Sequence, residues 1–287
     1  MKVLVTGSNG QLGYDVIKEL NKRSYETVGV DIAEMDITDM ASVISVFEKE
    51  RPDAVVHCAA WTAVDLAESN EEKCRAVNAT GTQNIVNACI KCGSKLIYPS
   101  TDYVFSGEGE TPWKPYDERS PLNVYGMTKY EGELAVEKYD KAFIIRIAWV
   151  FGKNGKNFVK TVLNLAKTRN ELNFVADQIG TPTYTYDLSR LIVDMLETEK
   201  YGTYHITNEG GYISWYDFVL EILKQANICG VKVNPVSSDE FKTAAKRPHN
   251  SRLDKSALRE NGFVPLPDWK DALHRYLMEI GEINESD

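Results

Sequence analysis

The chain has 287 residues, of which 43% are hydrophobic and 26% charged, and its formal net charge is −9 at pH 7. This composition is typical of a soluble globular protein, long enough for one large domain with a smaller lobe. The acidic balance disfavours binding to nucleic acid or to a membrane surface, and no apolar run of 18 residues predicts a membrane span.

Short β-branched strands alternate with helical patterns through the first half of the chain. In chain order, the sequence predicts strands at 2–7, 26–31, 53–60, 94–101 and 142–152, and helices at 10–23, 39–52, 68–93 and 123–139, with a long loop at 106–121. This alternation is typical of an α/β fold of the Rossmann type, a doubly wound parallel sheet with helices on both faces.

The second half is less regular and carries several prolines. We expect a dinucleotide-binding domain with the catalytic residues at 1–152. Residues 153–287 are expected to form mainly a substrate-binding lobe, with some segments that return to the first domain.

A glycine-rich turn follows the first predicted strand and opens the first predicted helix. Its glycines are Gly7, Gly10 and Gly13, and Gln11 and Leu12 lie between them. Such a turn lets the backbone approach a pyrophosphate, which the free N–H groups at the helix N-terminus then bind. In this position the motif favours a dinucleotide site over an ordinary strand–helix turn.

An acidic residue, Asp31, ends the second predicted strand. A carboxylate at this place accepts hydrogen bonds from the 2′-hydroxyl of the adenosine ribose and repels a 2′-phosphate. No lysine or arginine follows before Lys49, so we expect NADH as the cofactor, with NADPH as the alternative. If the chain doubles back after this strand, Asp36 and Ile37 lie beside the adenine.

A tyrosine and a lysine, Tyr125 and Lys129, lie one turn apart on the helix predicted after the long loop. Taken alone, this spacing is equally typical of a solvated helix face. The strand before the loop brings Thr101 and Asp102 to the carboxyl edge of the sheet, where a doubly wound fold binds its ligand. The combination with the glycine turn favours proton transfer as the role of the pair.

The five cysteines are odd in number and follow no secretory signal, because the first apolar run already ends at Gly7. They therefore predict reduced thiols and a cytoplasmic protein. The spacing of Cys89 and Cys92 resembles half of a zinc site. Since no second C-x-x-C pair accompanies it, we interpret these thiols as structural or incidental.

Beyond these motifs, the chain resembles the extended short-chain dehydrogenases/reductases, and within them the dTDP-4-dehydrorhamnose reductases. Six segments spread over most of the chain carry the resemblance: TGSNGQLG (6–13), HCAAWTAVDLAE (57–68), STDYVFSGEGE with PYDERSPLNVYGMTKYEGE (100–133), GTPTYTYDLSR (180–190), GTYHITNEGGYISWYDF (202–218) and RPHNSRLDKSAL (247–258). A generic Rossmann fold does not require the last of these.

The resemblance implies a reduction of dTDP-4-dehydro-L-rhamnose, a dTDP-linked 4-keto-6-deoxy sugar, to dTDP-L-rhamnose by hydride transfer to the C4 ketone. Tyr125 would donate the proton. A free tyrosine has a pKa of about 10, and the Lys129 ammonium would lower that pKa and hold the nicotinamide ribose. Thr101 would bond to the reacting oxygen.

The resemblance also assigns residues to the cofactor and to a metal. Ala60, Trp61 and Thr62 would line the cofactor. Some relatives are homodimers bridged by Mg²⁺ through surface carboxylates, and Asp15 is the one residue here that we connect with such a site. The resemblance therefore leads us to expect a bound Mg²⁺ and a homodimer.

Four residues are expected to contact the substrate. By resemblance, Asp102 contacts the sugar hydroxyls and Trp149 the substrate, unless this tryptophan is simply a core aromatic. Arg247 and Arg252 offer planar donors for the diphosphate. The alternative is structural, in that Arg252 pairs with an acid such as Asp254.

Two other functions are open at this point. The first is another nucleotide-sugar enzyme of the superfamily, an epimerase, a different reductase or a 4,6-dehydratase. The dehydratase pattern T-D-E is absent, since Tyr103 follows Asp102. The second is a cofactor-binding regulatory subunit like the β subunit of some methionine adenosyltransferases, which shares this fold without catalysing a reaction.

Overall fold

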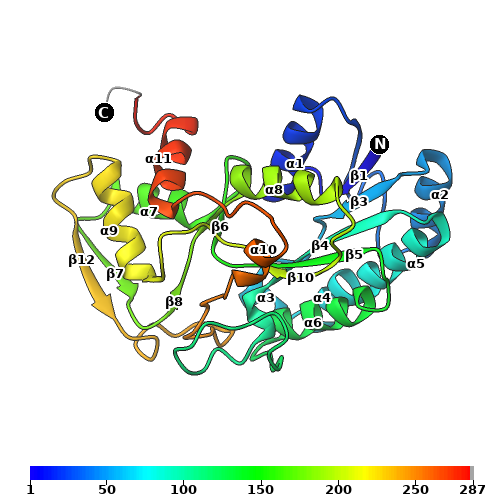
Figure 1. The fold of residues 1–287 in the computed structure, drawn as a ribbon. Helices are drawn as coiled ribbons and strands as arrows, with labels where there is room; N and C mark the ends of the chain where they lie inside the picture. The colour runs from blue at the N-terminus through cyan, green and yellow to red at the C-terminus, as the bar shows by residue number, and fades with distance from the viewer. Residues whose placement is uncertain (285–287) are drawn as a thin grey trace.

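The centre of the molecule is a parallel sheet of six strands in the order β2-β1-β3-β4-β5-β10 (Figure 1). The computed structural model describes residues 1–284. The strands are β1 (Lys2–Thr6), β2 (Glu26–Val30), β3 (Ala54–His57), β4 (Lys95–Thr101), β5 (Ala142–Ile147) and β10 (Gly202–His205). Because the strand order reverses at β1 and β3, their carboxyl ends open the crevice where such sheets bind ligands.

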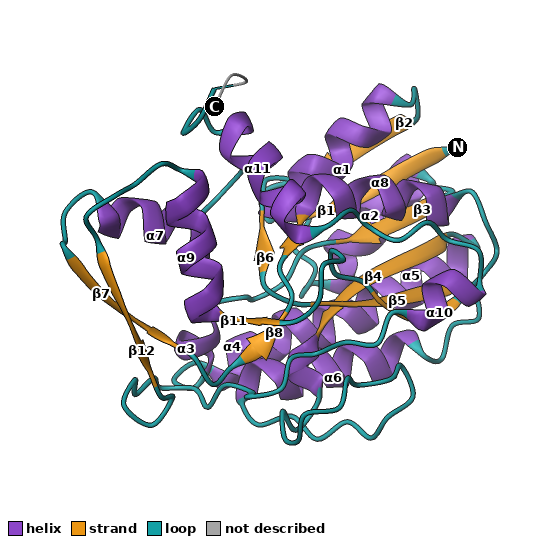
Figure 2. Cartoon of the chain, turned by 60° about the vertical axis from the view of Figure 1, so that its left-hand side comes forward, coloured by secondary structure: helices purple, strands orange, loops and turns teal. Residues whose placement is uncertain are grey.

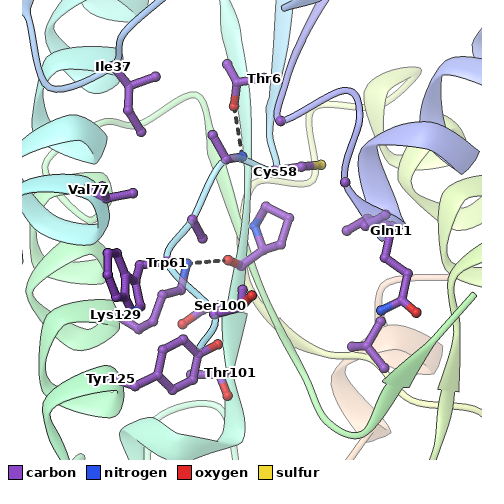
Figure 3. A pocket seen from close by; sticks show the side chains of 18 of the residues that line it. Thr6, Gln11, Ile37, Cys58, Trp61, Val77, Ser100, Thr101, Tyr125 and Lys129 are labelled. Carbon is purple, nitrogen blue, oxygen red and sulfur yellow. Dashed lines mark hydrogen bonds between the residues drawn. The ribbon is translucent and has the colours of Figure 1, made fainter. Parts of the chain in front are cut away.

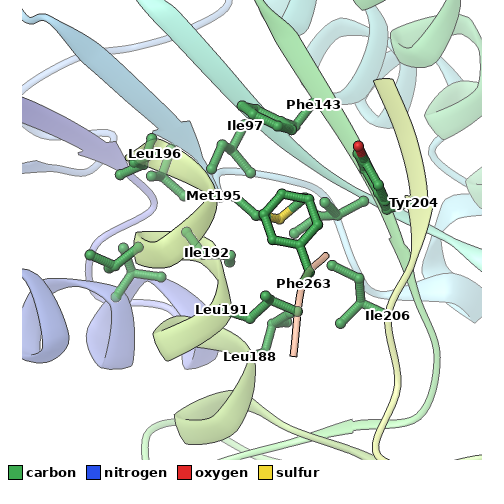
Figure 4. Close-up of a cluster of buried hydrophobic side chains, with 14 of the residues drawn as sticks. Ile97, Phe143, Leu188, Leu191, Ile192, Met195, Leu196, Tyr204, Ile206 and Phe263 are labelled. Carbon is green, nitrogen blue, oxygen red and sulfur yellow. The ribbon is translucent and has the colours of Figure 1, made fainter. Parts of the chain in front are cut away.

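Helices cover both faces of this sheet, as the sequence predicted. One face is covered by α1 (Gln11–Lys22) and α8 (Thr185–Leu196), and the other by α2 (Met40–Glu50), α5 (Thr82–Cys92) and α6 (Val124–Val136). Successive residues of β1 point to opposite faces, so that Val3 and Val5 join the first core and Leu4 the second. Figure 4 shows the first core, where α8 packs against β4, β5 and β10.

A nearly continuous helical stretch leads from the carboxyl end of β3 towards β4. It consists of α3 (Val64–Ala67), α4 (Glu71–Arg75), a π-helical segment (Ala76–Gly81) and α5. After β4 the chain forms a short 3₁₀ turn (Asp102–Val104) before the long loop that precedes α6. No helix within residues 1–284 combines the length and the apolar character needed to cross a membrane.

A second group of elements packs beside the carboxyl edge of the sheet (Figure 2). It contains three two-stranded sheets, β6 (Val150–Phe151) with β9 (Thr183–Tyr184), β7 (Glu171–Val175) with β12 (Lys232–Val236), and β8 (Ile179–Gly180) with β11 (Ile213–Ser214). Its helices include α7 (Phe158–Ala166), α9 (Trp215–Gln225) and α11 (Trp269–Glu279), whereas the short helix α10 (Ser256–Glu260) packs against β10 and the first core. Of these, α7, α9 and α11 share one aromatic-rich core. The domain boundary at residue 152 stays a prediction.

The strand predicted at 142–152 is wrong in one respect. It is interrupted after Ile147, and Val150 and Phe151 pair with β9 outside the main sheet. The cause is Trp149, which adopts a left-handed backbone conformation with φ of 51° and so turns the chain out of the sheet. This bend places the tryptophan at the carboxyl edge.

Candidate active site

A cavity of about 890 Å³ crosses the carboxyl edge of the sheet between the two groups of elements. This volume lies within the usual range of ligand pockets, about 300–1,000 Å³. Most of the residues that the sequence predicted for the site line it: Gly7, Gly10, Gln11, Leu12, Asp31, Asp36, Ile37, Ala60, Trp61, Thr62, Thr101, Asp102, Tyr125, Lys129 and Trp149. Gly13, Arg247 and Arg252 do not line it.

The glycine turn forms one end of the cavity. Gly7 has φ of 63°, and a Cβ on it would lie 2.7 Å from the backbone nitrogen of Ala59, so no larger residue fits there. Gly10 is the N-cap of α1 and provides no side-chain cap, which leaves the first N–H groups of the helix for a ligand. Gly13 packs against the turn, where a Cβ would lie 2.2 Å from the Gly7 carbonyl oxygen. This cradle fits the pyrophosphate of a dinucleotide.

Asp31 lies next to the glycine turn, directly after β2. Its Oδ2 accepts a hydrogen bond from the backbone N–H of Asn9 at 3.2 Å, and its Oδ1 accepts from the N–H of Ile32 at 2.9 Å. A carboxylate oxygen can accept more than one hydrogen bond, so both retain capacity for a ribose hydroxyl. The carboxylate of Asp36 accepts from Thr38 instead, so Asp36 stabilises its own turn while it lines the cavity.

Tyr125 and Lys129 lie on the face of α6 that borders the other end of the cavity. Figure 3 shows both side chains near Thr101, with Gln11 on the opposite wall. The Nζ of Lys129 donates to the carbonyl oxygen of Pro99 at 2.8 Å and lies 4.0 Å from the ring centroid of Tyr98. The hydroxyl of Thr101 donates to Oδ1 of Asp102 at 3.0 Å. The structure therefore brings the predicted hydroxyl, phenol and amine together.

Burial dominates the electrostatics of this pair. It lowers the pKa of Lys129 to about 7, while the charge of Glu133 acts in the opposite direction. Burial also raises the pKa of Tyr125 above that of a free tyrosine, against the effect of the Thr101 hydroxyl. Burial of the phenolate is the main cause of this rise. The lowering of the tyrosine pKa that we expect from Lys129 together with the nicotinamide stays a prediction.

Comparison with known proteins agrees with this geometry. A family model described as RmlD substrate binding domain matches residues 1–281. The chain is also 39% identical over 285 residues to dTDP-4-dehydrorhamnose reductase of Aggregatibacter actinomycetemcomitans, with 95% of this chain and 97% of the relative covered. The chain belongs to the dTDP-4-dehydrorhamnose reductase family.

Two solved structures extend the comparison to the fold. A dTDP-4-dehydrorhamnose reductase from Bacillus anthracis, in complex with NADP, superposes with a TM-score of 0.94 at 43% identity, covering 97% of this chain and 99% of that one. The ortholog from Clostridium acetobutylicum gives a TM-score of 0.95 at 41% identity, covering 98% and 99%. The resemblance read from the sequence is confirmed at the level of the family.

At the reacting end of the cavity, Asp102 is an unusual acid. Its side chain is 2% exposed, one oxygen accepts from Thr101, and the other, Oδ2, has no hydrogen-bond partner in residues 1–284. Burial raises the pKa of Asp102 to about 6, opposed by the hydroxyls of Ser251 and Thr101. An unpaired buried oxygen is costly.

The sequence analysis missed Asn78, which links two walls of the cavity from the π-helical segment. Its Oδ1 accepts from the N–H of Trp61 at 2.8 Å, and its Nδ2 donates to the carbonyl oxygen of Trp61 at 3.1 Å. The same Nδ2 donates to the hydroxyl of Thr128 at 3.1 Å, and that hydroxyl bonds to the carbonyl oxygen of Tyr125. The available signal was a polar residue on the buried side of a predicted helix.

The two arginines predicted for the diphosphate have other partners. Arg247 pairs with both carboxylate oxygens of Asp65 on α3, at 2.7 and 3.2 Å. Arg252 donates to the side-chain oxygen of Asn250 at 3.0 Å. The alternative pairing is not formed among residues 1–284, where the Asp254 carboxylate accepts from Ser256 and no ion pair joins it to Arg252. The geometry does not support a contact of either arginine with a ligand in this cavity.

Asp15, the residue connected with magnesium, does not belong to a metal site within residues 1–284 of one copy. Asp15 is 1% exposed, and one of its oxygens accepts a hydrogen bond from the hydroxyl of Thr185. Within residues 1–284, no group of three or more His, Cys, Asp or Glu side chains is arranged to hold a metal ion, Cys89 and Cys92 included. All five cysteines are free thiols.

Proposed function

We propose that the protein reduces dTDP-4-dehydro-L-rhamnose to dTDP-L-rhamnose, with a reduced nicotinamide dinucleotide as the hydride donor. The observation that carries the proposal is one cavity that joins the glycine turn to Thr101, Tyr125 and Lys129. The family of the chain supports the substrate, since its relatives carry the name of this reaction.

Tyr125 is the proposed proton donor. When bound, the nicotinamide supplies the hydride that adds to the C4 carbon. The pKa of Tyr125 is raised by burial, so the phenol holds its proton until the C4 oxygen becomes a stronger base. Thr101 can turn its hydroxyl from Asp102 towards the same oxygen and stabilise the charge that develops there. Lys129, when charged, favours the phenolate that remains.

Asp102 is the proposed acceptor for a sugar hydroxyl, through its unpaired Oδ2. Trp149 is proposed to contact the sugar nucleotide, since it lines the same cavity as Asp102. The second group of elements serves as the substrate lobe in this proposal. We further propose a cytoplasmic protein that forms a homodimer, which light scattering on the purified chain can check.

The test is an assay with the purified chain and no partner protein. Adding dTDP-4-dehydro-L-rhamnose should oxidise one NADH for each dTDP-L-rhamnose formed, as followed by absorbance and by mass spectrometry. A protein that binds NADH but does not oxidise it with any dTDP-linked 4-keto sugar contradicts the proposal and favours a regulatory subunit. Product identity separates this reaction from those of related reductases and epimerases.

NADH is the proposed preferred cofactor, with NADPH as the alternative, because the Asp31 carboxylate lies where a 2′-phosphate would be repelled. The relative from Bacillus anthracis binds NADP, so the preference needs its own test. We expect Asp31→Ala to weaken NADH binding much more than NADPH binding, measured by fluorescence titration. Equal use of both cofactors by the unchanged protein contradicts this preference.

A further inference from the structure

Two tryptophan rings stack in the wall of the cavity. The centroids of Trp149 and Trp215 are 3.6 Å apart, with an angle of 13° between the ring planes. Trp149 lies in the bend between β5 and β6, and Trp215 is the first residue of α9, which follows β11 (Figure 2). Both rings line the cavity together with Asp102 and Tyr103. The stack is therefore part of the wall of the proposed active site.

The surrounding structure fixes the orientation of Trp149. Its left-handed backbone, costly for a bulky residue, is held by a hydrogen bond from the N–H of Thr183 to the Trp149 carbonyl oxygen at 3.1 Å. The hydroxyl of Thr183 also donates to the carbonyl oxygen of Ala148 at 2.7 Å. Gly180 lies against the indole, and a Cβ there would approach the ring to 2.8 Å. The backbone on two sides is thus built to admit this ring.

Trp215 is held equally firmly. Ser214 caps α9 through a reciprocal capping box with Asp217, which fixes the first turn of the helix. Phe158 on α7 packs against this ring, with 4.3 Å between the two ring centroids. Two independent elements therefore present the stacked pair as one rigid surface.

The indole N–H groups distinguish this pair from the other tryptophans. The chain has five tryptophans. The N–H groups of Trp61, Trp113 and Trp269 donate to backbone carbonyl oxygens at 3.1, 3.1 and 3.2 Å. Those of Trp149 and Trp215 have no hydrogen-bond partner among residues 1–284. Both rings are half-buried and line the cavity, so these two donors are open to a ligand there.

The cavity offers few cationic side chains to an anionic substrate. A dTDP-sugar carries a diphosphate, whereas the only cationic side chains among the described residues that line the cavity are Lys73 and Lys129. Lys129 lies at the reacting end beside Tyr125. A sugar nucleotide in this cavity must therefore be held largely by neutral N–H donors and by the flat apolar faces of the rings.

We propose that Trp215 is a substrate-positioning residue. Its ring supports Trp149 from behind, so that the two indoles form a platform for the sugar nucleotide, and its N–H donates to an oxygen of that ligand. This inference rests on the proposed function, because it names how the same substrate is held. It requires no role of Trp215 in cofactor binding.

Two variants separate the roles of the ring and the N–H group. Trp215→Phe keeps an aromatic ring and removes the donor, and Trp215→Leu removes both. Trp269→Phe is the matched control, because it also removes an indole N–H but lies in the core and outside the cavity. The probe is dTDP-L-rhamnose, titrated by calorimetry into the purified full chain. Kd for NADH, KM for the keto sugar, kcat and thermal melting are measured in parallel.

We expect Trp215→Leu to raise Kd for dTDP-L-rhamnose and KM for the keto sugar by roughly 5- to 10-fold, the size of a lost aromatic contact. Trp215→Phe should show a smaller rise, the control none, and Kd for NADH should change in neither Trp215 variant. The far-ultraviolet circular dichroism couplet of the stacked indoles should disappear in both.

Unchanged Kd and KM in Trp215→Leu would overturn the inference. An equal weakening of NADH would do the same, since it indicates a general structural role. A third outcome separates the two proposals. If the Trp215 variants weaken dTDP-L-rhamnose binding as expected, but the unchanged protein does not oxidise NADH, the role of Trp215 stands and only the proposed function is contradicted.

Discussion

At Tyr125 the protein stabilises the neutral phenol. Burial raises the pKa of this tyrosine and lowers that of Lys129 to about 7, so both groups favour their uncharged forms compared with free side chains. A phenol that keeps its proton is suited to act as a donor to a developing alkoxide. The positive charge that would ease its ionisation depends on the protonation of Lys129, which changes close to neutral pH.

We expect Tyr125→Phe to lower kcat by about 10²–10⁴-fold, the usual contribution of general acid catalysis. The ring remains, so its edge-on packing with Tyr103, 5.6 Å between centroids, and cofactor binding should persist. Steady-state kinetics and NADH fluorescence titration measure the two effects. A folded variant with near-normal kcat excludes Tyr125 as the donor.

The second prediction at this scale concerns pH and Asp102. The pKa of this buried acid is raised to about 6, whereas in the unfolded chain it should be near 3.8. Between these values the folded state retains a proton that the unfolded state releases, so stability from the neutral acid is present below about pH 4 and is lost as pH rises through 6. The difference between pKa values of about 6 and 3.8 corresponds to roughly 3 kcal/mol.

Asp102→Asn should remove this dependence. Urea unfolding from pH 4 to pH 7 should show that the variant gains stability relative to the unchanged protein as pH rises, by up to roughly 3 kcal/mol. Other titrating groups cancel in the difference between the two proteins. Parallel stability profiles would show that the carboxyl of Asp102 titrates normally.

At the scale of elements, local spacing predicted the parts that depend on neighbours in sequence. The turn that begins at Gly7 and the Tyr125–Lys129 pair are such parts, since strand–turn–helix geometry and helical periodicity place them. The break at Trp149 could not be read in this way, because the apolar pattern continues through the bend. The contacts with Gly180 and Thr183 that accommodate the bend lie far along the chain.

The π-helical segment shows the same limit. Its residues continue a helical pattern, and only the folded structure shows that Asn78 faces the backbone of Trp61. Single-turn π segments often occur at functional sites. Here the hydrogen bonds of Asn78 connect Trp61, in the part of the chain after β3, to Thr128 on α6, the helix that carries Tyr125.

We expect Asn78→Ala to raise Kd for NADH and to destabilise the fold by about 1–3 kcal/mol, because it leaves the N–H and C=O of Trp61 without their partners. Asn78→Asp, which keeps the acceptor for the Trp61 N–H, should restore part of both. Fluorescence titration and thermal melting provide the measurements.

The control for this prediction is Asn87→Ala, an exposed position on α5 whose side chain bonds to Gln83 and to no other of the described residues. It should leave cofactor binding unchanged. If Asn78→Ala lowers stability without any effect on NADH, the link to the cavity wall is structural only.

At the scale of the whole molecule, the second group of elements is tied to the sheet by polar contacts beside the cavity. Arg247 pairs with Asp65, and the side chain of Asn123, the N-cap of α6, donates to the carbonyl oxygen of Lys246 at 2.8 Å. The alternation of strands and helices predicted the sheet, but not these contacts. When a charged side chain lies in an irregular segment, the sequence does not show whether it binds a ligand or a carboxylate far along the chain.

Replacing Arg247 separates these two roles. Because the pair with Asp65 is partly exposed, with side chains 25% and 45% accessible, its loss should cost about 1 kcal/mol and lower Tm by about 2–4 °C. We expect Arg247→Gln and Asp65→Asn to have similar effects, and the double variant to add little to either, as for one shared interaction. KM for the dTDP-sugar should change no more than Kd for NADH.

A diphosphate contact would give the opposite pattern. Arg247→Gln would then raise KM for the dTDP-sugar selectively, while Asp65→Asn, which frees the guanidinium for phosphate, would leave KM unchanged or lower it. Melting curves and kinetics of the four proteins in the cycle therefore distinguish a tie between the two parts of the molecule from a ligand contact. The bidentate geometry of the Arg247–Asp65 pair favours the tie, since both carboxylate oxygens already take the donors that phosphate would need.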